Sequence, residues 1–166
     1  MDLGFNQSQS HGQTHGTEPT LADAKSYIYS VDFSQVIDRL KLTEGWSDDA
    51  AITTCQLYRN FLYLNKKYSD HGMLPPSEDI DEFWHAHLLD TKKYILDCQH
   101  IFGKYFHHYP YLVLDKQFTY HELQATFEMT QQLHEKEFGS LIYESRSKWE
   151  KMKFQIKKII QLLKGN

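Results

Sequence analysis

The sequence predicts an all-α protein, an irregular bundle of four to five helices preceded by a disordered N-terminal tail. Over most of the chain, large apolar residues recur three and four positions apart, which is the spacing of one face of a helix. Several of these runs follow a serine or threonine and open with acidic residues, as is typical of a helix start. No segment alternates apolar and polar residues over the length of a strand, so no sheet is expected.

The chain is expected to form one domain. With 166 residues, of which 40% are hydrophobic, it is long enough to bury one core and short for two. Residues 1–20 consist mainly of Gln, Ser, Gly, Thr and His, and so few large side chains cannot offset the entropy lost on ordering. The sequence therefore predicts a disordered tail over residues 1–20 and a single helical domain over residues 21–166.

The first two predicted helices lie before residue 70. Residues 32–40 carry apolar side chains on one side, and Gly45 ends this helix. Ser47 is a typical N-cap, and the two aspartates after it stabilise the positive end of the helix dipole. The second helix is expected to run from there to about Tyr68, with Cys55 as a buried, inert thiol on its apolar side.

The third predicted helix follows a loop that contains two adjacent prolines. Ser77 resembles an N-cap, and three of the next four residues are acidic. The helix is expected to continue without a break to about Phe102, where Gly103 stops it.

Two more helices are predicted in the last third of the chain. Thr119 and Glu122 form a capping-box pattern that introduces a helix through His134, with a break or kink at Gly139. Residues 141–163 then place large apolar side chains at helical spacing, which predicts a long C-terminal helix.

Composition excludes several classes of protein. The net charge is −4 and the sequence pI is about 6.2, so no overall positive field favours nucleic acid. Neither a secretory signal nor a transmembrane segment is expected, because no apolar run is long enough. Two cysteines do not make a disulfide framework, so reduced thiols and a cytoplasmic location are the simplest expectation.

Chemistry is concentrated in residues 79–111, which hold five of the ten histidines and one of the two cysteines. At about 100° per residue, His87 and Cys98 fall on the apolar side of the helix, so both are expected to be buried. Asp81 and His85 form an i, i+4 pair on the helix flank, where a carboxylate and an imidazole can share an ion. Because His85 and His87 point about 200° apart, only one of them is expected to be a metal ligand.

Further ligands are expected from the residues after Gly103, because a turn there returns the chain toward the helix. His107 and His108 are the best candidates, and His71 and His121 are weaker ones. A mixture of imidazole and carboxylate suits a divalent metal, zinc or iron above all, with copper as a further option. The predicted metal ligands are Asp81, His85, His87 and His108, and the predicted supporting residues are Trp84, Asp90, Tyr94, Cys98 and His107.

The alternative interpretation gives these residues no chemical role. A histidine among apolar residues is often a hydrogen-bonded core residue, and an exposed Asp81–His85 pair contributes only about 0–1 kcal/mol. Polar clusters inside a core are costly, however, and tend to mark functional sites. The grouping therefore favours a metal or catalytic site, although each histidine alone does not.

The site belongs to a longer pattern. Its parts are Tyr58-Arg59-Asn60-Phe61-Leu62, Pro76, Asp81-x-x-Trp84-His85-x-His87-x-Leu89-Asp90-Thr91-x-x-Tyr94-x-x-Asp97-Cys98-x-x-x-Phe102-Gly103 and His107-His108-x-Pro110-Tyr111. This pattern, over about residues 45–112, resembles the bacterial glycine-rich domain-containing protein-like family, which is related to a module of plant glycine-rich domain proteins. The chain lacks the glycine-rich segment of that family. The resemblance brings no activity and implies only one unit made of Asp81, Trp84, His85, His87, Asp90, Tyr94, Cys98 and His108.

Two functions remain open from the sequence. The first is a small soluble protein that binds a divalent metal at the histidine cluster, with or without catalysis at an open coordination position. The second is a non-catalytic protein–protein interaction module. For it, the segment from Lys148 to the C-terminus carries six lysines and one glutamate, a net charge of +5. Such a helix can dock on an acidic protein or an anionic membrane surface, or simply be a bundle helix with a solvated face.

Overall fold

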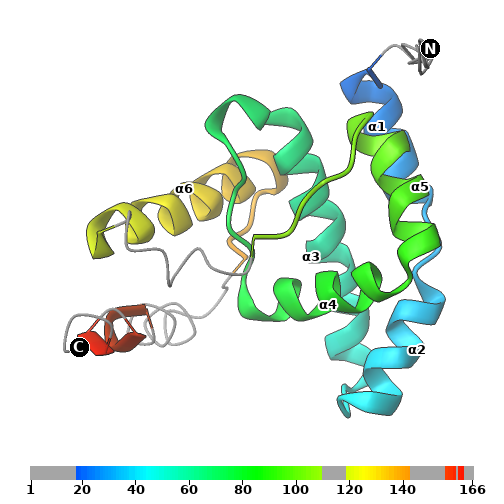
Figure 1. Ribbon diagram of the computed structural model, residues 1–166, viewed down its shortest axis with the longest axis horizontal. Helices are drawn as coiled ribbons and strands as arrows, with labels where there is room; N and C mark the ends of the chain where they lie inside the picture. Colours follow the sequence, from blue (N-terminus) through cyan, green and yellow to red (C-terminus); the bar gives the residue numbers. More distant parts are fainter. Residues whose placement is uncertain (1–17, 110–118, 143–155, 160, 163–166) are drawn as a thin grey trace, which may run out of the picture.

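The computed structural model describes residues 18–109, 119–142, 156–159 and 161–162, and all regular structure within them is helical (Figure 1). The predicted all-α class is confirmed. The described part contains more helices than the four to five predicted. They are α1 (Leu21–Ser30), α2 (Ser34–Thr43), α3 (Asp48–Lys67), the 3-10 helix η1 (Ser69–His71), α4 (Glu78–Leu89), α5 (Thr91–Phe102) and α6 (Tyr120–Phe138), with residues 156–159 and 161–162 helical as well.

The predicted N-caps are confirmed where they were read from the sequence. The side chain of Ser47 accepts a hydrogen bond from the backbone N–H of Ala50, and Ser77 caps α4 in the same way. At the start of α6 both halves of the Thr119–Glu122 capping box are formed. These local bonds satisfy backbone donors that the first helical turn leaves free, so they fix where each helix begins.

The continuous helix predicted from residue 77 to residue 102 is wrong. The chain leaves helical geometry at Asp90, whose ψ is 71°, and α4 and α5 lie on either side of it. The carboxylate of Asp90 accepts a hydrogen bond from the backbone N–H of Lys93 and so acts as the N-cap of α5. An aspartate that bonds the backbone ahead of it competes with helix continuation, which explains the break.

Helix α1 was not predicted as a separate element. Its side chains Ala24 and Ile28 are the buried ones, so its apolar stripe is too narrow to stand out in the sequence. Thr20 caps it by accepting a hydrogen bond from the backbone N–H of Asp23. At its C-terminal end Arg59 donates hydrogen bonds to the backbone carbonyls of Ile28 and Val31. Arg59 therefore fastens the end of α1 to α3.

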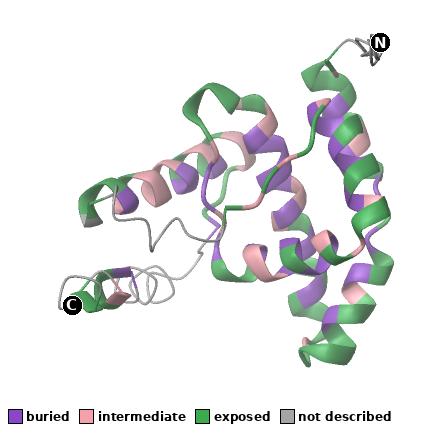
Figure 2. Cartoon of the chain, viewed as in Figure 1, coloured by how far each residue is buried: buried purple, intermediate pink, exposed green. Residues whose placement is uncertain are grey.

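Helix α3 is the centre of the bundle. It contacts α1, α2, α4, α5 and α6, and the buried faces of these helices turn toward it (Figure 2). Within α3 every side chain from Asn60 to Asn65 is buried, as expected for a helix with neighbours on several sides. Helices α4 and α5 pack on α3 and on each other, and the chain after α5 then runs back across the bundle. This arrangement brings residues after Gly103 to the surface of α4.

Some predictions fall on parts of the chain that the structure does not describe. They are the tail before residue 18 and most of the C-terminal helix predicted over residues 141–163, with four of its six lysines. Ile156 is buried, and Lys157 and Lys158 beside it are exposed. Among the described residues, none of the helices has both the length and the apolar content needed to cross a membrane.

Candidate metal centre

Asp81 and His85 lie one turn apart on the outer side of α4. The i, i+4 spacing brings the Nδ1 atom of His85 to 3.8 Å from the Oδ2 atom of Asp81. Both side chains are open to solvent, with exposed fractions of 50% for His85 and 36% for Asp81. The predicted carboxylate–imidazole pair is therefore present at the helix surface.

A second imidazole comes from the loop after α5. The Nε2 atom of His108 lies 2.7 Å from the Oδ1 atom of Asp81, and its ring lies 4.5 Å from that of His85. Asp81, His85 and His108, which we call the His/Asp cluster, each offer one ligand atom, and these atoms all lie within 4.8 Å of one another. Residues 27 positions apart thus form one group because the loop returns to α4.

The spacing of the cluster is close to what a metal ion requires. Imidazole nitrogens and carboxylate oxygens bind zinc at about 2.0–2.2 Å, so ligand atoms around one ion lie roughly 3–3.5 Å apart. The Asp81–His108 distance of 2.7 Å would open slightly and the Asp81–His85 distance of 3.8 Å would close slightly. The widest spacing in the cluster, up to 4.8 Å, would have to shorten as well, so the three side chains would have to move closer together around an ion.

Aromatic packing and two polar contacts hold the loop that carries His108. The hydroxyl of Tyr94 accepts a hydrogen bond from the Nε1–H group of Trp84 at 2.9 Å and donates one to the backbone carbonyl of Phe106. The ring of Phe106 stacks on Trp84, and the ring of His108 meets the same indole edge-on. The backbone N–H of Phe106 also contacts the Cys98 sulfur. Trp84, Tyr94 and Cys98 therefore position the loop from beneath.

Burial shapes the chemistry of these supporting groups. It raises the pKa of the Tyr94 hydroxyl far above its ordinary value, so this group keeps its proton and can donate to Phe106. Burial also raises the pKa of the Cys98 thiol. The predicted burial of His87 and Cys98 is confirmed, with 1% and 3% of their surfaces exposed.

His87 does not join the His/Asp cluster, because other groups occupy both of its ring nitrogens. Its Nδ1 atom lies 2.9 Å from the hydroxyl of Tyr58, and its Nε2 atom lies 2.9 Å from the Oδ2 atom of Asp97. The Nε2 contact is close, although the ring is not aligned for a good hydrogen bond. Tyr27 donates to the other oxygen of Asp97 at 2.7 Å, and Lys93 lies 3.1 Å from Oδ2.

These five residues form what we call the buried hub, which joins four helices. Tyr27 comes from α1, Tyr58 from α3, His87 from α4, and Asp97 and Lys93 from α5. Burial raises the pKa of Asp97, but the contacts with His87, Tyr27 and Lys93 outweigh it and hold the pKa below its ordinary value. The hub thus contains a buried carboxylate that is charged at neutral pH.

The other candidate residues lie elsewhere. Asp90 is the N-cap of α5, and His107 is exposed beside the ring of Tyr105. His71 lies against Tyr68, and His121 is exposed at the start of α6.

The sequence interpretation assigned no role to Tyr27, Tyr58 or Asp97. The available signal was Asp97 itself, an acidic residue on the core-facing side of a helix, one position before the buried Cys98. Its partners come from helices far away in the sequence, so spacing alone did not reveal them.

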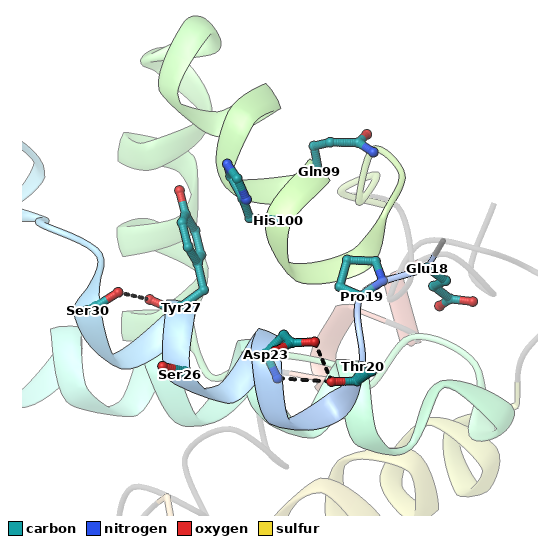
Figure 3. Close-up of a pocket in the computed structure, with 9 residues that line it drawn as sticks. All are labelled: Glu18, Pro19, Thr20, Asp23, Ser26, Tyr27, Ser30, Gln99 and His100. Atoms are coloured by element: carbon teal, nitrogen blue, oxygen red, sulfur yellow. Dashed lines mark hydrogen bonds between the residues drawn. The ribbon is translucent and has the colours of Figure 1, made fainter. Parts of the chain in front are cut away.

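A separate cavity of about 670 Å³ lies between α1 and the C-terminal half of α5 (Figure 3). It is lined mainly by polar side chains, and none of the cluster residues reaches it. The ring of Tyr27 forms part of the wall, stacked on the ring of His100, while its hydroxyl bonds Asp97. The cavity therefore touches the buried hub and is distinct from the His/Asp cluster.

Comparison with known proteins identifies the family. Residues 24–139 match the family model described as UCP032817-like, and the chain belongs to this family. The resemblance to the glycine-rich domain-containing protein-like family was wrong, because the family model that matches is a different one. The match spans α1 to α6 and includes the His/Asp cluster and the buried hub. Searches of curated proteins and of solved structures found no match.

Proposed function

We propose that this member of the UCP032817-like family binds one divalent transition-metal ion through Asp81, His85 and His108. The observation that carries the proposal is the mutual spacing of three potential ligand atoms, all within 4.8 Å of one another. Two imidazoles and one carboxylate suit zinc or iron, and copper also accepts such ligands. His87, which the sequence offered as an alternative to His85, is engaged in the buried hub and is left out of the ligand set.

The surroundings of the cluster support a cation. Glu78, Asp79 and Glu82 accompany Asp81 in the first turns of α4, and their negative charges favour the approach of a positive ion. Trp84 packs against the His108 ring and limits the orientations that this ligand can take. A metal ion would take the place of the proton in the hydrogen bond between His108 and Asp81. Both ligand atoms would then keep a partner when the metal binds.

Three protein ligands leave at least one coordination position for water or another small molecule. A metal bound in this way acts as a Lewis acid and lowers the pKa of its bound water. Because His85 is exposed and Asp81 is partly exposed, solvent and solutes reach this position directly. The proposed site is therefore of the open kind found in metalloenzymes.

The test is metal binding by protein purified without a histidine tag. We expect one zinc or ferrous ion per chain after dialysis, and His85→Ala or His108→Ala to weaken binding by roughly a hundredfold or more in calorimetric titration. The matched control is His107→Ala, because His107 is an exposed histidine on the same loop with no part in the cluster. The proposal fails if the wild-type protein takes up no zinc, iron or copper, or if His107→Ala loses as much affinity as His108→Ala.

A further inference from the structure

His134 of α6 is a buried histidine whose two ring nitrogens have opposite roles. Only 1% of its surface is exposed. Its Nδ1 atom lies 2.6 Å from the backbone carbonyl of Ser140, which can only accept, so Nδ1 carries the proton. Its Nε2 atom lies 3.0 Å from the Nδ2 atom of Asn60 on α3. The ring is therefore neutral, with Nε2 accepting a hydrogen bond from Asn60.

The orientation of the Asn60 amide is fixed by two other donors. Its Oδ1 atom accepts hydrogen bonds from the hydroxyl of Tyr29 at 2.8 Å and from the amide of Gln56 at 3.1 Å. The amide nitrogen must then face His134. If Nε2 took up a proton, two donors would meet across 3.0 Å, and rotating the Asn60 amide to offer its oxygen would lose its bonds to Tyr29 and Gln56 unless both of those groups reoriented as well. The contact between α3 and α6 thus requires the neutral ring.

The other polar contacts between α6 and α3 do not change in the same pH range. Glu137 pairs with Lys67 at 2.6 Å and accepts a hydrogen bond from the hydroxyl of Tyr68 at 2.6 Å. These contacts hold the pKa of Glu137 below its ordinary value, so it stays charged at pH 5.5. Tyr29, behind Asn60, stays neutral because burial raises its pKa.

No carboxylate among the described residues forms an ion pair with His134. The charged neighbours on its own helix are Glu135, Lys136 and Glu137, of which Glu135 and Lys136 are exposed. The ring of Phe138 lies 4.8 Å away and packs on Tyr63 of α3. A protonated ring would therefore be buried among neutral and apolar groups.

We propose that His134 is a proton-operated latch, which holds α6 on α3 at neutral pH and releases it in mildly acidic conditions. Helix α6 extends away from the rest of the bundle, and α3 is the helix on which it packs among the described elements (Figure 1). Loss of the His134–Asn60 contact therefore acts on the point where α6 is attached. Helices in proteins owe most of their stability to tertiary packing, so α6 released from α3 loses its backbone protection.

The pH range of the latch follows from where His134 binds its proton. Burial lowers the pKa of His134 in the docked state below the ordinary value of 6.5, against a smaller opposing effect of the Ser140 bond. In the released state the ring is solvated and titrates near 6.5. Released chains then bind more protons than docked chains below pH 6.5, so docking weakens as the pH falls through this value and is constant above it. Between pH 7.5 and 5.5 the released fraction rises by up to about tenfold.

Hydrogen–deuterium exchange of the full chain tests the latch. After correction for intrinsic exchange rates, we expect protection of the α6 backbone to fall several-fold, up to about tenfold, from pH 7.5 to 5.5, while protection of α3 changes less. His134→Gln should abolish the fall, because a glutamine amide can donate to Ser140 and accept from Asn60 without titrating. His100→Gln is the matched control, since His100 is exposed on α5, which makes no contact with α6 among the described helices, and it should behave like the wild type.

Three results would overturn the latch. The first is equal protection of the α6 backbone at pH 7.5 and pH 5.5. The second is a loss of α6 protection in His134→Gln as large as in the wild type. The third is a loss of protection in α3 as large as that in α6. If His134→Gln does not fold, titration of the wild-type His134 ring by NMR decides, because a pKa at or above 6.5 in the folded protein contradicts the latch.

Discussion

Replacing Asp97 with alanine should destabilise the protein by about 3–5 kcal/mol, the usual cost of breaking a buried charged pair. The carboxylate of Asp97 is buried at the junction of α1, α4 and α5, where it meets Tyr27, His87 and Lys93. Alanine removes the carboxylate that all three side chains approach and leaves the Nε2 atom of His87 buried with no oxygen beside it. Urea unfolding at pH 7, followed by circular dichroism, measures the loss.

Two neighbouring substitutions are the controls. Tyr27→Phe removes one neutral hydrogen bond and should cost about 1 kcal/mol. Lys93→Ala removes a partly exposed charge and should cost about 1 kcal/mol or less, because Tyr27 still donates to the carboxylate and the His87 ring stays beside it. Equal effects for Asp97→Ala and Lys93→Ala would mean that the buried hub does not hold the four helices together.

The Asp97 contribution also has a pH signature. Its pKa in the folded protein is below the ordinary value of 3.8, so the unfolded chain binds the proton first as the pH falls. The stabilisation is therefore complete well above pH 3.8 and fades as the pH drops below it. The difference in stability between wild type and Asp97→Ala should shrink in the same range.

Tyr94→Phe should affect stability and metal binding together. The change deletes a hydroxyl that accepts from Trp84 and donates to Phe106, and it leaves the indole N–H buried without a partner, at a cost of about 1–3 kcal/mol. The loop that carries His108 also loses one of its anchors. We expect metal affinity to fall by about ten- to a hundredfold, the usual effect of losing support behind a ligand.

Tyr105→Phe is the matched control for Tyr94→Phe. Tyr105 packs edge-on against Tyr94 but is 43% exposed, so its hydroxyl is open to water. We expect near wild-type stability and affinity for this variant. Should Tyr94→Phe lower stability while metal affinity stays unchanged, Tyr94 would support the fold alone and not the position of His108.

Most of the fold follows from local signals in the amino-acid sequence. Ser47, Ser77 and Thr119 cap helices where they were predicted to, because an N-cap depends on bonds within three residues. The angle between His85 and His87 also follows from helix geometry, and the structure places them on opposite sides, one exposed and one buried.

Tertiary contacts explain what the sequence did not reveal. The break at Asp90 depends on one side chain–backbone bond that an aspartate forms in some contexts and not in others. It also sets the direction of α5 and so brings Asp97 to His87 across ten residues. Tyr58 contacts His87 from 29 positions away, and Tyr27 contacts Asp97 from 70 positions away. No periodic pattern in the sequence encodes such pairs.

The most direct test compares His85→Gln with His87→Gln by titration with zinc, because these two histidines lie two positions apart and have separate roles. We expect His85→Gln to weaken zinc binding by roughly a hundredfold or more, with little change in stability because its side chain is half exposed. His87→Gln should lower the unfolding midpoint and keep zinc affinity within about threefold of wild type, since His87 serves the buried hub. The reverse result, with zinc binding lost in His87→Gln and kept in His85→Gln, would contradict the separation of the metal site from the hub.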